Sequence, residues 1–202
     1  MNIARKYLQI VKISIFFAHL SFTLLLFCSC ANNRLIKELE QFMGQEINLS
    51  SDLSALWEEK EITLSDFAEA PLKLVVWYDS LGCTSCDVSR MYQWSEMISY
   101  ADSLAESFRI VYLFTPKKDN LYSLNITLQA DKLDYPIFID QHATFVKQNP
   151  SLSKNRQLHS FLLDKNNRVV LVGNPLHNPS LWSLYKRTIQ KMIDNDGVLP
   201  EQ

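Results

Sequence analysis

Blocks of apolar residues along the chain predict a sheet of at least five strands. Two long runs, Leu72–Asp79 and Phe108–Phe114, are rich in β-branched and aromatic residues and predict strands buried on both faces. Shorter apolar runs predict further strands at 137–140, 159–164 and 168–173. Asp, Lys and Asn residues separate the last two runs, and this composition favours a hairpin because Asn and Asp tolerate the left-handed backbone of tight turns.

Helical spacing of apolar positions predicts helices between and after these strands. The last helix begins at Asn178 and Pro179, since Asn caps a helix and Pro is tolerated in its first turn. Two short strands are also expected, at 46–49 and 62–64. Parallel strands joined by helices and followed by a hairpin predict an α/β mixed sheet that is covered on both faces. The other expected helices are 31–44, 87–107, 120–131 and 143–148.

The first 29 residues predict an export signal that is not part of the fold. A positively charged start precedes an apolar run, 13–27, that is shorter than a membrane span of about 20 residues. Ser29 before Cys30 resembles the cleavage site of a bacterial lipoprotein signal, which implies lipidation of Cys30. A plain secretory signal and an uncleaved anchor are the alternatives. The expected organisation is a signal peptide at 1–29, a lipidated N-terminus and spacer at 30–44, and one domain at 45–202.

Composition restricts the class of protein. The chain has 202 residues, of which 47% are apolar, and this suffices for one domain with an ordinary core. The first 29 residues hold three of the 20 basic residues and none of the 22 acidic ones, so the remainder carries a net charge of −5. Nucleic-acid binding favours a basic face, so no nucleic-acid partner is expected.

The cysteines provide the candidate chemistry. With Cys30 assigned to the lipid, Cys83 and Cys86 are the thiols of the predicted domain, and they flank Thr84 and Ser85. The pair follows a predicted strand and precedes a predicted helix, whose N-terminus favours a thiolate. A lone pair of thiols in an oxidising compartment forms a disulfide unless a partner reduces it. The pair therefore predicts a thiol–disulfide site.

The element order and the place of this pair resemble the TlpA-like branch of the thioredoxin fold, whose members are extracytoplasmic, membrane-tethered thiol–disulfide oxidoreductases. The resemblance spans about 45–193 and implies a thioredoxin-like mixed sheet flanked by helices on both faces. The stretch from Asp79 to Cys86, together with Gly173-Asn174-Pro175, resembles poorly characterised lipoproteins of Bacteroidetes-type bacteria. The other matching segments are 63–67, 74–78, 135–140 and the hairpin 161–173.

The resemblance implies a role for each cysteine. Cys83 would be the exposed attacking thiolate and Cys86 the buried resolving thiol, with a Cys83–Cys86 disulfide in the oxidised state. The implied substrate is an envelope protein with a disulfide. No cofactor is expected, and a membrane protein would supply the electrons. The implied location is the periplasm-facing surface of the inner or outer membrane. The residues expected near a substrate groove are Tyr78, Asp79, Thr84, Ser85, Leu158 and His159. Asp79 is expected to cap the turn ahead of the pair, with proton transfer near Cys83 as the alternative.

The sequence departs from the family at three positions. Leu81-Gly82 stands where a tryptophan usually precedes the first cysteine, and Leu158 stands at about the place of the family's cis-proline. Trp77 stands where the family often has an acidic residue. Asp87 directly follows the pair and opposes a thiolate, while no Lys or His adjoins the pair in sequence. We therefore expect a weakly acidic Cys83 and a reducing couple.

Three other interpretations of the pair stay open. The cysteines can form a structural disulfide or two inert thiols, or they can bind a metal. His142, His159 and His177 lack the spacing of metal ligands, so no metal site is predicted and each histidine is expected at the surface or at a cap. The fold can also serve as a non-catalytic protein-binding module of the cell envelope.

Overall fold

The computed structural model describes residues 33–49, 53–57, 60–82, 84–104, 106–117, 121–131 and 135–200. The chain divides into two compact units, Met1–Gln41 and Phe42–Gln202. In the first unit, residues 33–41 are helical, and Arg34 and Glu38 form an ion pair at 3.0 Å one helical turn apart. The predicted signal and Cys30 lie outside the described residues.

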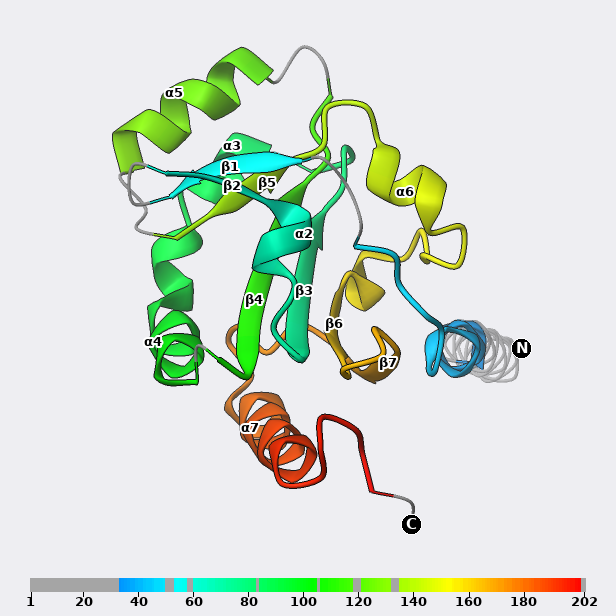
Figure 1. Ribbon diagram of the computed structural model, residues 1–202. Coiled ribbons are helices and arrows are strands. Elements are labelled where there is room, and N and C mark those ends of the chain that lie inside the picture. The colour runs from blue at the N-terminus through cyan, green and yellow to red at the C-terminus, as the bar shows by residue number, and fades with distance from the viewer. Residues whose placement is uncertain are drawn as a thin grey trace, which may run out of the picture. The chain divides into compact units, whose positions relative to one another are not determined.

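The second unit is built on a five-stranded sheet in the order β5-β4-β3-β6-β7 (Figure 1). β3 pairs in parallel with β4 and antiparallel with β6, while β5 joins β4 in parallel and β7 joins β6 antiparallel. All five strands match the sequence prediction to within one residue at each end. Their bounds are β3 (Leu72–Tyr78), β4 (Phe108–Phe114), β5 (Ile137–Ile139), β6 (Ser160–Leu163) and β7 (Val169–Val172).

One face of this sheet is covered by α4 (Ser95–Ser103) and α7 (Pro179–Ile193). The two helices contact each other through Trp182, whose ring meets that of Tyr100 at 5.3 Å and whose indole N–H donates to Glu96 Oε1 at 3.0 Å. Both helices present apolar side chains to the sheet, because their buried positions recur at helical spacing.

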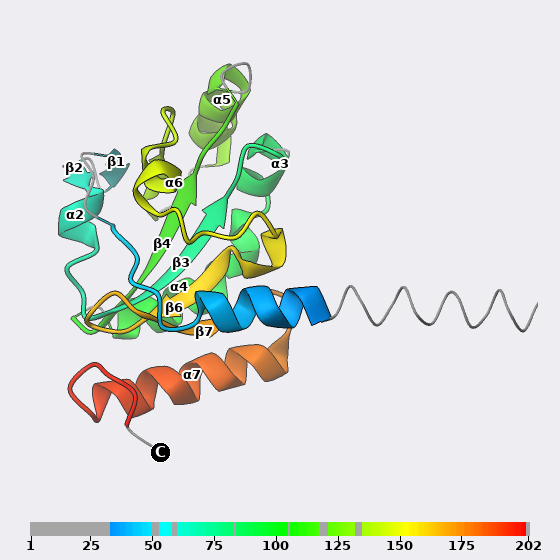
Figure 2. The same cartoon turned by 90° about the vertical axis from the view of Figure 1, so that its right-hand side faces the viewer.

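The opposite face is covered by α2 and α6 (Figure 2). Phe67 of α2 packs on Phe138 of β5 with ring centres 5.6 Å apart, and Phe145 of α6 packs on Trp77 of β3 at 6.1 Å. Burial on both faces explains the nearly continuous apolar sequence of the central strands. The helices not yet given bounds are α2 (Leu64–Phe67), α5 (Leu121–Asp131) and α6 (Thr144–Gln148).

The single helix predicted over 87–107 is wrong. The segment instead forms α3 (Thr84–Val88), the 3-10 turn η1 (Met91–Trp94) and α4, which ends at Ser103. Ser89 Oγ donates to the carbonyl of Cys86 at 3.0 Å, and Ser103 Oγ donates to the carbonyl of Tyr100 at 2.7 Å. Each hydroxyl occupies a carbonyl that a continuing helix would use, so both serines favour a break.

A second, two-stranded sheet precedes α2. It pairs β1 (Ser54–Trp57) antiparallel with β2 (Lys60–Thr63). The sequence pattern predicted a strand near β2 but none at β1. The strand predicted at 46–49 is reduced to one antiparallel bridge between Glu46 and Arg168.

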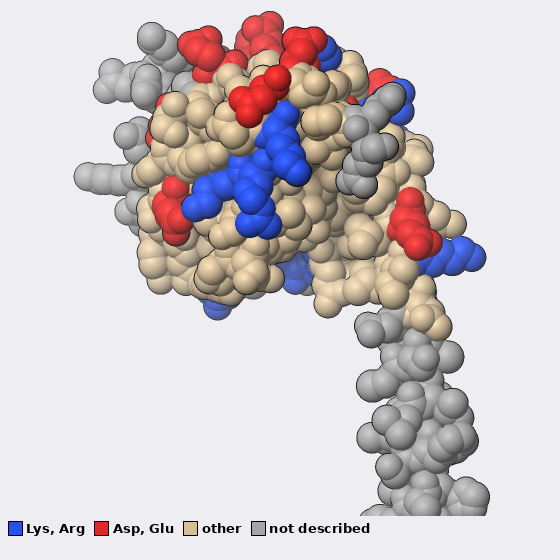
Figure 3. Space-filling model, turned by 90° about the horizontal axis from the view of Figure 1, so that it is seen from below, with Lys and Arg blue, Asp and Glu red and all other residues tan. Residues whose placement is uncertain are grey.

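Helix α7 begins as the sequence predicted, because Asn178 Oδ1 accepts the N–H of Leu181 at 3.0 Å. Its sequence carries Lys186, Arg187 and Lys191. Figure 3 shows basic side chains gathered on the face seen from below, with acidic groups around them.

Among the described residues, no helix combines the length and the apolar character that crossing a bilayer requires.

Candidate dithiol site

The dithiol segment connects the central strand β3 to helix α3. Cys86 lies in α3 and is disulfide-bonded. The expectation that Cys86 is buried is wrong, because the short helix α3 leaves this residue exposed to solvent. It is the only cysteine among the described residues, so the partner sulfur lies outside them, as does the predicted nucleophile Cys83. Thr84 and Ser85 form the first turn of α3, and their side chains are not described.

Asp79 directly follows β3 and lies at the start of the segment that leads to α3. Its carboxylate is almost fully buried, and Oδ1 accepts the N–H of Leu81 at 3.0 Å. This is the turn cap that the sequence favoured for Asp79. The same oxygen lies 3.4 Å from Nε of Arg156.

Arg156 comes from a different part of the fold and reaches both ends of the dithiol segment. It begins the 3-10 turn η3 (Arg156–Leu158), which directly precedes β6. Its Nε faces Asp79, and its Nη2 lies 3.7 Å from Oδ2 of Asp87, the residue after Cys86. One guanidinium thus bridges a carboxylate ahead of the cysteine pair and a carboxylate behind it.

Gly82 allows this close approach. A Cβ at this position would lie 2.6 Å from Nη2 of Arg156 and 3.2 Å from Oδ2 of Asp87. The guanidinium therefore packs against the backbone of the residue that directly precedes Cys83. Leu81 beside it is 72% exposed, so the loop ahead of the cysteine pair presents an apolar side chain to solvent.

Asp87 is half-buried, and its charge is influenced by several neighbours. Burial raises the pKa of the Asp87 carboxyl above its usual value, while Arg156 and Arg90 act in the opposite direction and Asp79 adds to the increase. The two arginines therefore offset only part of the effect of burial on this carboxyl.

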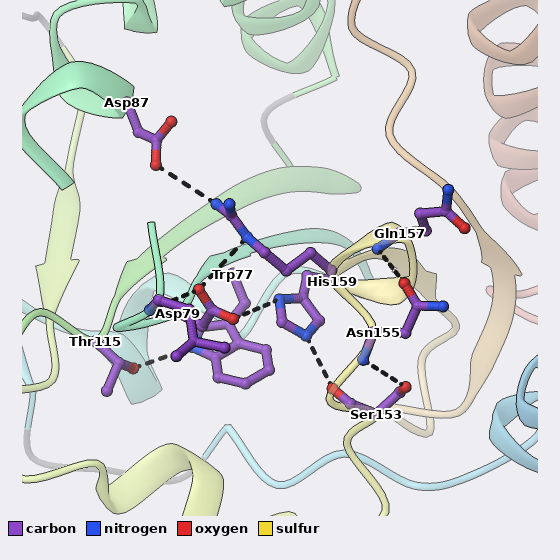
Figure 4. Close-up of polar contacts among 10 residues, drawn as sticks. Trp77, Asp79, Asp87, Thr115, Ser153, Asn155, Gln157 and His159 are labelled. Atoms are coloured by element: carbon purple, nitrogen blue, oxygen red, sulfur yellow. Dashed lines mark hydrogen bonds and ion pairs between the residues drawn. The ribbon is translucent and has the colours of Figure 1, made fainter. Parts of the chain in front are cut away.

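His159 lies beside Asp79 and against the ring of Trp77 (Figure 4). The two ring centres are 4.1 Å apart, and only 4% of His159 is exposed. Its Nε2 lies 2.8 Å from the carbonyl of Ser153, so Nε2 carries the proton of the neutral ring. Its Nδ1 faces Oδ2 of Asp79 at 3.9 Å and has no hydrogen-bond partner among the described residues.

Burial lowers the pKa of His159 below its usual value, although the Ser153 carbonyl and Asp79 raise it in part. The sequence-based expectation that each histidine is a surface or capping residue is therefore wrong for His159. The reason is tertiary, because Trp77 and the loop at Ser153 enclose the ring. His142 and His177 are exposed, as expected. Within the described part of the chain, no group of three His, Cys, Asp or Glu residues is placed to hold a metal ion.

The other predicted groove residues lie around the same segment. Tyr78 stacks on Phe114 with ring centres 4.4 Å apart, and burial raises the pKa of its hydroxyl to about 12. Leu158 is buried at the end of η3, directly before His159. No peptide bond among the described residues is cis, so the chain enters β6 here without the cis-proline of the resembling family.

The strand order, with a parallel central pair joined through α3 and α4 and an antiparallel hairpin on the other side, decides the architecture. The fold is thioredoxin-like. The α/β mixed sheet flanked by helices on both faces is thus confirmed. Helix α3 stands where the dithiol of that fold is expected, at the carboxyl end of the first central strand.

No family model matches the chain, and no curated protein matches it. Similar solved structures include an uncharacterized conserved protein from Geobacillus kaustophilus, with TM-score 0.53, 11% identity and coverage of 79% of this chain and 86% of that chain. Another is the thioredoxin domain of a thiol-disulfide oxidoreductase from Bacteroides vulgatus, with TM-score 0.46, 18% identity and coverage of 70% and 96%. At these identities the likeness concerns the fold.

Sequence reasoning missed Arg156, the residue that links the two sides of the segment. It lies 70 residues after Cys86, in a turn without regular periodicity. The nearest sequence signal is that Arg156 stands two residues before Leu158. Leu158 occupies about the position at which the resembling family brings its cis-proline to the dithiol. Only the packing of η3 against Gly82 reveals the contact.

Proposed function

We propose that this protein is an envelope thiol–disulfide oxidoreductase that works through Cys83 and Cys86. The observation that carries the proposal is the exposed, disulfide-bonded Cys86 in the helix that follows the central strand of a thioredoxin-like sheet. An exposed, disulfide-bonded cysteine next to a loop with an exposed leucine is accessible to another protein, and exposed disulfides are the ones that exchange readily.

The proposed direction is reduction of a substrate disulfide. The thiolate of Cys83 attacks one sulfur of the substrate disulfide and forms a mixed disulfide with it, while the other substrate sulfur leaves as the first thiolate and takes up a proton. Cys86 then loses its proton and attacks the sulfur of Cys83. The mixed disulfide breaks, the second substrate thiolate leaves, and the Cys83–Cys86 disulfide remains, so two electrons have passed to the substrate.

The cycle requires a source of two electrons, because the compartment is oxidising. We assign this role to a membrane-embedded dithiol reductase, as the resemblance to the TlpA-like branch implies. Cleavage after Ser29 and lipidation of Cys30 would hold the domain at the periplasmic surface of the inner or outer membrane, close to such a donor. The domain boundaries proposed are 1–29 for the signal, 30–44 for the spacer and 45–202 for the thioredoxin-like domain.

A trapping experiment tests the chemistry. The Cys86→Ala variant, mixed with insulin as a disulfide-bearing probe, is expected to accumulate a mixed disulfide through Cys83, because the resolving step is lost. The matched control is the Cys83→Ala/Cys86→Ala double variant, which has no nucleophile. A Cys86→Ala variant that forms no more adduct than this control would refute the oxidoreductase and favour a non-catalytic protein-binding module of the envelope.

The reduction potential tests the direction. Equilibrating the chain in thiol buffers and alkylating free thiols gives the potential of the pair. We expect a value near the thioredoxin end of the scale, about −270 mV, and a value near about −120 mV would make the protein an oxidant instead. A pair that never equilibrates would show that the disulfide is sealed and structural.

A further inference from the structure

Among the described residues, Arg156 is the one arginine or lysine whose charged group lies within 4 Å of either carboxylate that brackets the dithiol segment. Asp79 stands four residues before Cys83, and Asp87 stands directly after Cys86. Thiol–disulfide exchange requires a thiolate in the midst of these carboxylates, and nearby negative charge suppresses ionisation of a thiol. The site therefore needs a compensating cation.

We propose that Arg156 is the positioning residue of the dithiol, which keeps its thiolate accessible by neutralising Asp79 and Asp87 and by fixing the loop at Gly82. The inference rests on the proposed function, because a thiolate matters only where exchange occurs. From the sequence alone, the negative charge of Asp87 opposes a thiolate and no neighbouring cation offsets it; in the structure Arg156 is that cation.

Three geometric facts support this role. First, the guanidinium lies 3.4 Å from Asp79, which directly follows β3, and 3.7 Å from Asp87, which lies in α3. Second, its Nη2 packs directly over Gly82, where any larger residue would collide with it. Third, η3 continues into β6, which pairs with β3, so the arginine is held by the sheet and not by a free loop.

The charge on the segment is set by few groups. Asp79 is buried and Asp87 is partly buried, whereas the Arg156 side chain is 50% exposed, so water screens these charges only in part. His159 is neutral at pH 7, so it does not supply the missing positive charge. Without Arg156 the segment would face two carboxylates with one exposed arginine nearby. The titratable and charged groups that face Arg156 and its partners are Tyr78, Asp79, Asp87, Arg90 and His159.

The test measures thiol ionisation directly. The reduced, lipidated full chain is alkylated with iodoacetamide from pH 5 to pH 10, and mass spectrometry follows Cys83 and Cys86 separately. Arg156→Gln keeps the size and polarity of the side chain but removes its charge. We expect it to slow alkylation of the more reactive cysteine at pH 7 by roughly tenfold, as a shift of about one pKa unit requires.

Matched variants separate charge from shape. Asp87→Asn is expected to speed the same reaction, and the Arg156→Gln/Asp87→Asn double variant should return towards the wild-type profile. Arg156→Lys retains the charge and should recover most of the rate. Gly82→Ala displaces the guanidinium through a Cβ placed 2.6 Å from Nη2, and should slow alkylation without any change of charge.

An unchanged pH profile in Arg156→Gln would overturn the inference. A slower reaction in both Arg156→Gln and Asp87→Asn would also overturn it, since a charge effect must have opposite signs in the two variants. The outcome is independent of turnover. If Cys86→Ala traps no insulin while Arg156→Gln still shifts the profile, the proposed function fails and the electrostatic role of Arg156 stands.

Discussion

Two fully buried tyrosines allow a sharp test of the packing on the α4 face. Tyr112 of β4 is 0% exposed, and its hydroxyl has no hydrogen-bond partner among the described residues. Tyr185 of α7 is also 0% exposed, but its hydroxyl donates to the carbonyl of Gly173 at 2.7 Å. The same Tyr→Phe substitution should therefore change stability in opposite directions at the two positions.

The magnitudes follow from the buried hydroxyls. An unsatisfied buried hydroxyl costs about 1–3 kcal/mol, and the space left by its oxygen costs ~0.3 kcal/mol, so Tyr112→Phe should raise the free energy of unfolding by about 1–2 kcal/mol. Tyr185→Phe removes the hydrogen bond to the Gly173 carbonyl and should lower the free energy of unfolding by ~1 kcal/mol. For a domain of this size, the two variants should differ in melting temperature by roughly 4–12 °C.

The assay is guanidinium denaturation of the oxidised protein at pH 7, followed by far-UV circular dichroism, with the wild type and both variants measured together. Equal slopes of the three transitions would show that the unfolded states are comparable. A Tyr112→Phe variant that loses as much stability as Tyr185→Phe would refute the reasoning, because it would show that the Tyr112 hydroxyl has a partner in solution.

Three further predictions concern single buried groups. Lys73 is 3% exposed and burial lowers its pKa to about 8 from 10.5, so Lys73→Met should stabilise the domain at pH 7 by about 1–3 kcal/mol. In denaturation from pH 7 to pH 10.5, the wild type should gain stability above pH 8, where the unfolded chain binds the extra proton, and the variant should lack this gain. Burial also lowers the pKa of His159, so the wild type should lose stability as the pH falls below about 6.5, and His159→Gln should remove that part of the acid sensitivity in melts from pH 7 to pH 5. Asp140 accepts the N–H groups of Thr144 and Phe145 at 2.9 and 2.8 Å at the start of α6, so Asp140→Ala should cost about 1–2 kcal/mol in denaturant titration, whereas an unchanged midpoint would show that water replaces the cap.

The candidate site was predictable where its signals are local. The place of Cys86 after a buried strand, and the turn cap made by Asp79, follow from neighbouring residues and were expected. The burial of His159 and the bridge formed by Arg156 were not, because both depend on η3 packing beside β3. Sequence spacing carries no signal for a contact between residues separated by about 70 positions.

The sequence by itself determined the five strands of the main sheet and the start of α7. Apolar runs such as Leu72–Tyr78 must be buried on both faces, and the cap at Asn178 acts within one turn, so their physical causes lie inside the segment. The tertiary structure alone decided the pairing of β1 with β2 and the electrostatics of the dithiol segment, because both depend on groups that folding brings together. The break of the predicted helix near Ser89 has a local cause, a hydroxyl that competes for a helix carbonyl, but a periodic apolar pattern does not reveal that competition.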